Sequence, residues 1–317
     1  MSESTLLQPQ AMSASRPRQS VTRGQRWREI RNSFWALVFL LPSLIVFVVF
    51  VFIPLVRSIE LSFHFTNPLG QMRGGLTLDH YQTLFAKPDF FNSVRVSVTF
   101  ALYMVTFTLV GSLILALLGN IQLKGISIFR AIFSSTVAVS GATASLIFLF
   151  LYNPSIGVFN YLLDLTHLPR VKWLTDTSTA LFSVSLVSVW LQLGLNTIIL
   201  LAGMQDIPEE LYEAARIDGA GFWQSLRNVT LPLLSPTIFF LIVVDTLAAF
   251  QAFTQFNVLT RGGPVQTTNT LVYSIFREFY FNGNYGYASA LAVILMLIML
   301  VFTILQFGVL ERRVHYQ

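Results

Sequence analysis

Six long apolar segments decide what this chain can fold into. Each is near or above the ~20 residues that an α-helix needs to cross the hydrocarbon of a bilayer. The segments cover residues 34–56, 94–118, 131–152, 180–204, 233–256 and 287–310. In lipid, only a helix satisfies its backbone hydrogen bonds within a single segment. The sequence lacks the alternating ten-residue pattern that indicates a β-barrel. We therefore expect an all-α integral membrane protein with six transmembrane helices.

The composition points to the same class. Of the 317 residues, 54% are hydrophobic and 11% are charged, whereas soluble domains carry roughly 25% charged residues. The net charge of +5 gathers in loops and tails, as membrane topology requires, so we expect no nucleic-acid partner. The chain has no cysteine, which excludes disulfides, thiolate catalysis and cysteine–metal sites.

Enzymatic chemistry has little support in the sequence. The four histidines are scattered among loops and the C-terminal tail: His64, His80, His167 and His315. A membrane-embedded enzyme would need clustered His, Asp or Glu residues near the interface. We therefore expect solvated surface histidines, no metal site and no catalytic residue.

Charge placement predicts the topology. Residues 1–33 form a tail with six arginines and little to bury, which we expect to be disordered and cytoplasmic. Residues 34–317 then form the transmembrane domain. The first apolar segment is too long for a signal peptide and ends in Ile53-Pro54-Leu55, so it is predicted to stay in the membrane. With the N-terminus inside, 12 of the 20 Lys and Arg residues face the cytoplasm, which predicts that both termini are cytoplasmic.

The loop between the fourth and fifth spans, residues 205–232, is charged and cannot cross a bilayer. Asp206 and Glu209 have the spacing of a capping box, which predicts a short helix over 211–217. Gly219 can adopt the positive φ that ends a helix, and a second helix is predicted after it. From these features alone, the loop could also be an amphipathic surface connector that merely joins two spans.

The spacing of this loop resembles the signature loop of binding-protein-dependent ABC importer permeases. That pattern is Glu-Ala-Ala, three residues, Gly, nine residues, an aliphatic residue, one residue, then Leu-Pro. This chain has Glu213, Ala214, Ala215, Gly219, Val229, Leu231 and Pro232 at those places. Val229 stands where isoleucine is more usual. The resemblance covers about residues 34–317.

In that family this loop, which we call the elbow, contains a coupling helix that docks in a groove of a cytoplasmic ATPase subunit. The resemblance implies that Glu213 is the charged contact to the ATPase and that Ala214 and Ala215 form the close-packing face. Gly219 would be the turn, and Leu231-Pro232 would mark the entry to the fifth span.

Two further stretches narrow the resemblance to carbohydrate-uptake permeases. Leu259-Thr260-Arg261-Gly262-Gly263-Pro264 resembles their outer loop before the last helix. The ending 311–317 is similar to the tail of the maltose and sn-glycerol-3-phosphate permease type. The resemblance implies an inner membrane of the bacterial type and an extracytoplasmic solute-binding protein that contacts Gly262, Gly263 and Pro264.

The resemblance also implies a second, homologous permease subunit and two cytoplasmic ATPase subunits, which would bind ATP and Mg. This chain carries no cofactor of its own. A P-loop has the pattern G-x-x-x-x-G-K-[ST], and none of the three lysines here follows a glycine. The energy source is therefore expected on another polypeptide.

Polar residues inside two spans suggest a substrate path. Asp245 lies near the middle of the fifth span, where an acid costs ~2.5–3.5 kcal/mol to insert, so it should face a cavity or a partner. A helical projection places Gln255 on the same side. In the fourth span, Ser188, Gln192 and Asn196 share one face. These groups could bind sugar hydroxyls, or they could simply join neighbouring helices.

The class of solute stays open at this level. The spans offer no cation near the path, which counts against an anionic solute. Import of sn-glycerol 3-phosphate or a related phosphodiester remains an alternative, because a partner permease could supply the charge. An ion-coupled secondary transporter is less favoured, because it calls for paired charges in the membrane and for broken half-helices in repeated positions.

Overall fold

The computed structural model describes residues 38–121, 123–309 and 311. Contacts divide the chain into two units, residues 1–56 and 57–317, and the candidate site lies entirely in the second. The basic tail expected over residues 1–33 lies outside the described residues. The first described helix, Val38–Ser62, has a mean hydropathy of 2.9 in its most apolar window.

The described residues are mostly helical. The first helix includes the π-helical turn η1 (Val48–Phe52) and ends as α2 (Ile53–Ser62), and a short hairpin follows, formed by β1 (Phe65–Thr66) and β2 (Met72–Arg73). The remaining elements are, in chain order, α3 (Asp79–Ala86), α4 (Pro88–Gly119), α5 (Ile126–Ser134), η2 (Ser135–Ala138), α6 (Gly141–Leu151), α7 (Val158–Leu165), α8 (Ala180–Gln205), α9 (Glu209–Ile217), α10 (Phe222–Ser225), η3 (Leu226–Thr230), α11 (Leu231–Leu233), α12 (Ser235–Phe250), α13 (Thr254–Leu259), α14 (Leu271–Phe276), η4 (Arg277–Phe281) and α15 (Tyr285–Val309).

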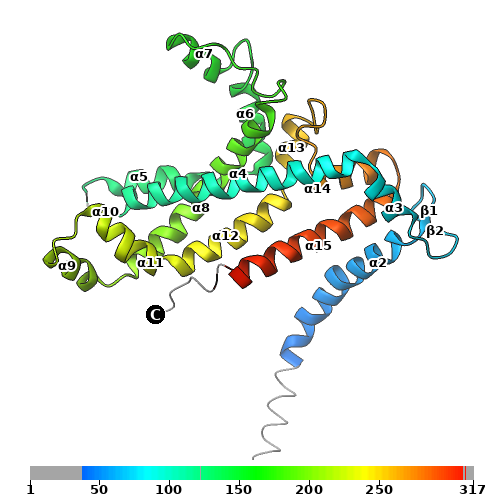
Figure 1. Ribbon diagram of the computed structural model, residues 1–317, viewed down its shortest axis with the longest axis horizontal. Helices are drawn as coiled ribbons and strands as arrows, with labels where there is room; N and C mark the ends of the chain where they lie inside the picture. The colour runs from blue at the N-terminus through cyan, green and yellow to red at the C-terminus, as the bar shows by residue number, and fades with distance from the viewer. Residues whose placement is uncertain (1–37, 122, 310, 312–317) are drawn as a thin grey trace, which may run out of the picture. The chain divides into compact units, whose positions relative to one another are not determined.

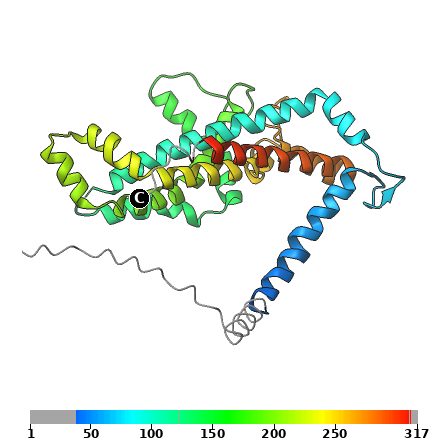
Figure 2. The same ribbon diagram turned by 60° about the horizontal axis from the view of Figure 1, so that its bottom comes forward.

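Four long helices of the second unit, α4, α8, α12 and α15, lie side by side in both views (Figures 1 and 2). Among the described residues, four helices are long and apolar enough to cross a membrane, and the number rises to six if each of two bent helix pairs counts as one span. The fold is therefore mostly helical and has four to six candidate spans.

Two expected spans are not single straight helices. In the third, η2 and α6 meet at a break where Val139 is extended, and the two halves differ in direction by 106°. The Ser140 hydroxyl restarts the helix by accepting the backbone N–H of Thr143 at 3.2 Å, a standard N-cap. In the fifth, the segment Phe222–Leu233 meets α12 at 66°, and α12 ends at Phe250. The helix expected to continue to residue 256 is instead divided into α12 and α13.

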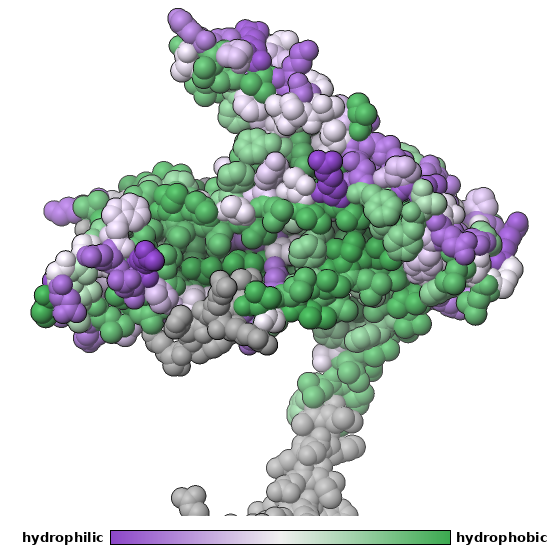
Figure 3. Space-filling view, in the orientation of Figure 1, coloured by the Kyte–Doolittle hydropathy of each residue, from purple (hydrophilic) through white to green (hydrophobic). Residues whose placement is uncertain are grey.

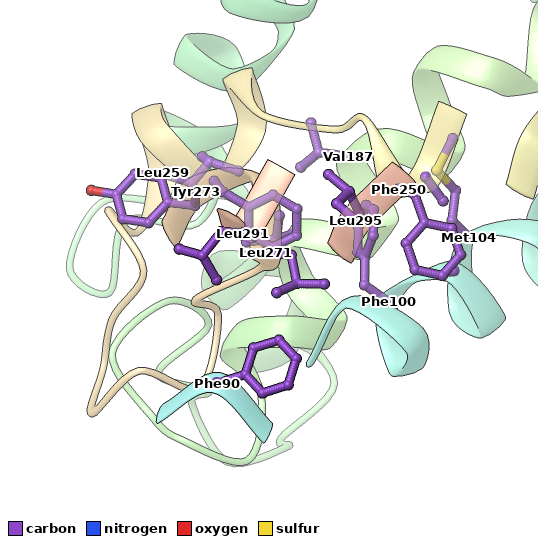
Figure 4. Close-up of a cluster of buried hydrophobic side chains, with 14 of the residues drawn as sticks. Phe90, Phe100, Met104, Val187, Phe250, Leu259, Leu271, Tyr273, Leu291 and Leu295 are labelled. Carbon is purple, nitrogen blue, oxygen red and sulfur yellow. The ribbon is translucent and has the colours of Figure 1, made fainter. Parts of the chain in front are cut away.

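The hydrophobic interior consists of two separate clusters. The larger one, which we call the loop-end core, includes Phe100, Val187, Phe250 and Leu291, and Figure 4 shows it in close-up. The smaller one, the elbow-end core, contains Ala116, Leu200, Met204, Ile207, Leu234 and Leu241. The same three helices, α4, α8 and α12, contribute to both cores.

The surface of the second unit matches a membrane-embedded bundle. In Figure 3 a hydrophobic band covers α4, α12 and α15, while hydrophilic side chains gather around α9 and α10 at one end and near β1 and β2 at the other. A band of this kind satisfies the requirement that apolar side chains face lipid and that charged loops face water.

One histidine departs from the expected surface position. His80 is only 7% exposed, and its Nε2 lies 3.0 Å from the backbone oxygen of His64. Its ring packs in edge contacts against Phe65 and Tyr287. The prediction of a solvated histidine is therefore wrong for His80, because α3 folds back against the hairpin and the start of α15.

The segment between α6 and α8 is organised around Asn160, which is 2% exposed. Its Nδ2 donates to the carbonyls of Pro154 and Val171 at 3.2 and 3.1 Å. Its Oδ1 accepts from the Val171 N–H at 3.1 Å and from the Trp173 indole at 3.0 Å. One amide side chain therefore fixes a long connection that has little regular structure besides α7.

Replacing Asn160 by alanine is expected to loosen this connection. The change leaves several buried groups without partners, at about 1–3 kcal/mol for an unsatisfied group. Hydrogen exchange of the Val171 amide should accelerate by at least about tenfold. Asp164→Asn is the matched control, because the Asp164–Arg170 ion pair on the same segment is largely exposed and bonds none of the groups that Asn160 holds, so the exchange of the Val171 amide should stay nearly unchanged. Unchanged exchange in Asn160→Ala would contradict the assignment.

Candidate functional site

A polar layer separates the two cores. On α8, Asn196 lies between Val187 of the loop-end core and Leu200 of the elbow-end core. On α12, Asp245 lies between Leu241 and Ala249 in the same way. The Asn196 Nδ2 donates to the Asp245 Oδ2 at 2.6 Å, so the layer joins the two helices.

Asp245 is fully buried, and its pairing is incomplete. Its Oδ1 has no hydrogen-bond partner among the described residues, and the same is true of the Thr108 Oγ1 on α4. An unsatisfied buried acceptor costs about 1–3 kcal/mol. Stability alone therefore does not account for an acid at this position.

A cavity of about 330 Å³ opens beside the polar layer. Its size lies in the range of roughly 300–1,000 Å³ that is usual for ligand sites. Its polar side chains are Thr136, Ser188, Gln192 and Gln255, and no charged side chain of the described chain lines it. Such a wall offers hydroxyls and amides to a solute and no countercharge.

The structure divides the five predicted path residues into two groups. Ser188, Gln192 and Gln255 line the cavity, whereas Asn196 and Asp245 do not. Gln255 reaches the wall from α13, not from α12, so the helical projection that joined it to Asp245 is wrong. The reason is the break after Phe250, which redirects the chain before residue 254.

Both helix breaks contribute to the wall of this cavity. Val139 and Gly141 border it at the break before α6, and Ala252 borders it at the break after α12. A Cβ added at Gly141 would lie 3.6 Å from the Gln255 Nε2, so the two breaks face each other closely. The cavity therefore depends on features that periodicity does not reveal.

The elbow consists of α9 and α10. Gly219 has a φ of +78°, a conformation that glycine adopts without strain, and the Ala220 N–H donates to the Ala215 carbonyl at 2.9 Å as the helix ends. Tyr212 and Thr230 join the two arms through their hydroxyls, which are 3.0 Å apart. The predicted turn at Gly219 is confirmed.

The predicted capping box at the start of the elbow is wrong. The N-cap of α9 is Pro208, and no side chain caps the helix. Asp206 instead ends α8, with its N–H donating to the Ala202 carbonyl at 3.2 Å. The preceding helix thus continues up to the residue that the spacing had assigned as a cap.

Of the predicted coupling residues, Glu213, Ala214 and Gly219 are exposed, while Ala215, Leu231 and Pro232 are half-buried. The structure adds three apolar side chains that were not predicted as part of this site. Ile217, Phe222 and Trp223 are 86%, 64% and 76% exposed, and the two aromatic rings pack edge to face. The sequence feature that could have predicted them is the presence of large apolar residues within a charged loop. Exposed apolar side chains of this kind suit a protein partner.

The loop that contains Gly262, Gly263 and Pro264 is tightly folded. Arg261, Gly262, Val265 and Gln266 all have positive φ, and the Gly263–Pro264 peptide is cis. A Cβ at Gly262 would lie 2.9 Å from the ring of Tyr273, so only glycine fits there. Within this loop Val265 is 86% exposed, and a cavity of about 440 Å³ lies beside Gly263 and Pro264.

Buried polar contacts hold this loop against α4. The Asn269 Nδ2 donates to the Ser93 Oγ at 3.2 Å, and the Leu271 N–H donates to the Ser97 Oγ at 2.9 Å. The Ser93 hydroxyl also pairs with the Ser274 hydroxyl at 3.0 Å. These contacts were not predicted, although Ser93 and Ser97 have the i, i+4 spacing of one helix face.

Comparison with known proteins places the chain in a family. Residues 125–316 match the model of the binding-protein-dependent transport system inner membrane component. The chain is 34% identical over 290 residues to the sn-glycerol-3-phosphate transport system permease protein UgpA of Pectobacterium atrosepticum, covering 90% of this chain and 97% of that protein. It is 35% identical over 280 residues to the protein of the same name from Brucella abortus, covering 87% and 94%.

Solved structures agree on the fold. A chain of a bacterial ABC transporter involved in the import of the acidic polysaccharide alginate matches with a TM-score of 0.78 and 23% identity, covering 91% of this chain and 99% of that chain. A second structure of the alginate transporter, in complex with a periplasmic protein bound to an alginate pentasaccharide, matches with a TM-score of 0.77 and 24% identity, covering 90% and 97%. The chain therefore belongs to the inner-membrane permease family of binding-protein-dependent ABC importers.

Proposed function

We propose that this permease imports an uncharged polyhydroxy solute, such as a sugar, an oligosaccharide or a polyol. The observation that carries the proposal is the cavity wall, where Ser188, Gln192 and Gln255 present a hydroxyl and two amides without a charged neighbour. Groups that both donate and accept hydrogen bonds match the hydroxyls of a sugar. The chain would form half of the translocation path, and a second, homologous permease would complete it.

A second candidate is sn-glycerol 3-phosphate, the solute in the names of the relatives from Pectobacterium and Brucella. A phosphate ester favours bidentate or cationic partners such as arginine. The cavity wall of this chain has none, so the second permease subunit would have to supply the charge.

The remaining parts of the proposal concern the partners. Two cytoplasmic ATPase subunits, which bind ATP and Mg, would dock on the elbow of residues 205–232, and this chain would perform no covalent chemistry itself. The exposed Ile217, Phe222 and Trp223 support that contact. A solute-binding protein would engage the opposite end, at Gly262 to Pro264. This arrangement requires six spans with both termini in the cytoplasm.

Purification of the importer with its native partners tests the proposal. ATPase subunits should co-purify, and hydrolysis in proteoliposomes should be stimulated by the loaded binding protein. The probes are maltose, raffinose, glycerol and sn-glycerol 3-phosphate. We expect a neutral probe to stimulate hydrolysis and to be taken up. Stimulation by sn-glycerol 3-phosphate alone would replace the proposed solute class with the alternative, and the absence of ATPase subunits would refute the partner assignment.

A further inference from the structure

The most informative group outside the cavity wall is the buried carboxyl of Asp245. It is 0% exposed and does not border the cavity, yet it contacts a side chain on the next helix at 2.6 Å. An acid that cannot touch a solute acts, if at all, through its neighbours. Its hydrogen-bonded neighbour is Asn196, which in turn contacts Gln192.

The contacts form a row with a defined direction. A carboxylate only accepts hydrogen bonds, so it fixes the Asn196 amide with its Nδ2 toward Asp245. The Asn196 Oδ1 is then available to the Gln192 Nε2, which lies 3.5 Å away. This contact directs the NH₂ end of Gln192 toward the polar layer.

The consequence concerns the other end of the same amide. With its NH₂ group held inward, Gln192 turns its Oε1 away from the layer, and Gln192 is the one member of the row that lines the cavity. We infer that Asp245 is a positioning residue for solute recognition: through Asn196, it holds Gln192 so that the cavity receives a hydrogen-bond acceptor. This inference rests on the proposed function of the cavity as the solute site.

Replacing the Asp245 carboxyl by an isosteric amide removes the fixed orientation of these hydrogen bonds. The Asp245→Asn side chain both donates and accepts, so Asn196 and Gln192 are free to turn by 180° with little change in packing. Gln192 then presents to the cavity either a hydrogen-bond donor or a mixture of its two orientations. The inference therefore predicts a change in recognition from a substitution that barely alters volume.

The kinetic test uses the complete importer in proteoliposomes and the probe that stimulates hydrolysis in the screen described above. Asp245→Asn should raise the apparent KM about tenfold, which corresponds to the loss of about one hydrogen bond to the solute, and should change the maximal rate less than about twofold. In a Gln192→Ala background, the same substitution should add less than about twofold. Independent, multiplying effects of the two substitutions would overturn the inference.

Gln306→Leu is the matched control. The Gln306 Nε2 donates to the Thr246 Oγ1 at 2.7 Å, so the substitution removes a hydrogen bond next to Asp245 without touching the cavity row. Its KM should stay at the wild-type value. An equal rise in KM would show that the loss of any hydrogen bond between α12 and a neighbouring helix has the same effect, and that Asp245 has no specific positioning role.

A second measurement requires no solute. In the importer labelled with ¹⁵N-glutamine and held in nanodiscs, the side-chain NH₂ signals of Gln192 can be identified by their loss in Gln192→Ala. Asp245→Asn should shift these signals, while those of Gln255, which lines the cavity from α13, should stay in place. Unchanged Gln192 signals would overturn the inference. If no probe is taken up, the proposed function fails, and this spectrum still decides the role of Asp245.

Discussion

Replacing Gly219 by valine is expected to reduce coupled uptake by at least about tenfold. The φ of Gly219 is +78°, and a left-handed conformation costs roughly 1–2 kcal/mol for a residue with a side chain, more for a β-branched one. No heavy atom lies within 4 Å of the added Cβ, so the strain comes from the backbone and not from a clash. The turn should therefore change, and α9 would no longer present Glu213 in the proposed docking position.

Uptake and ATP hydrolysis are measured together in proteoliposomes. Hydrolysis should continue without stimulation by the loaded binding protein, and Glu213→Ala should show the same pattern more weakly. Gly221→Ser is the control for Gly219→Val, because Gly221 has a φ of −78° and open space around its Cβ. Normal uptake in both Gly219→Val and Glu213→Ala would remove the coupling role of the elbow.

Gly194→Leu is expected to have the largest effect on stability. A Cβ at Gly194 would lie 2.6 Å from the Phe133 carbonyl oxygen and also collides with the Thr136 Oγ1. Because one of these atoms belongs to the backbone of α5, the helices must separate. Overpacking of this kind costs about 3 kcal/mol, which corresponds to a fall in melting temperature of roughly 6–12 °C for a domain of this size.

Thermal unfolding in detergent, followed by size-exclusion chromatography, measures the effect. Gly308→Leu provides the matched control, because no heavy atom lies within 4 Å of a Cβ at that position in α15. Its melting temperature should equal that of the wild type. A fall of less than about 2 °C in Gly194→Leu would mean that α8 and α5 are not in the close contact described here.

The sequence predicts the class of fold and the elbow for clear physical reasons. Lipid leaves few options for an apolar segment of 20 residues, and a charged stretch between two such segments must leave the bilayer. The positive φ of Gly219 follows from local chemistry, because few other residues tolerate it.

The breaks before α6 and after α12 could not be predicted, because no proline marks them. Ser140 caps a new helix only because the chain turns there, and serine within an apolar segment equally suits a continuous helix. The same is true of the break after Phe250, which moves Gln255 onto α13. Tertiary packing decides both breaks, and periodicity within one segment carries no information about it.

The pairing between helices could not be predicted from the sequence either. A projection places Asn196 and Asp245 on polar faces, but it does not determine the rotation of either helix. The contact at 2.6 Å depends on that rotation, and it explains why Asp245 lies behind the cavity wall.

The division of the interior into two cores has an evolutionary consequence. Substitutions in the loop-end core change the space around Gln255 while leaving the packing of Leu200, Met204 and Leu241 intact. We therefore expect that the solute bound at the cavity can change in evolution without a change in the packing next to the elbow, where we propose that the ATPase docks. The polar layer of Asn196 and Asp245 keeps the packing constraints of the two cores apart.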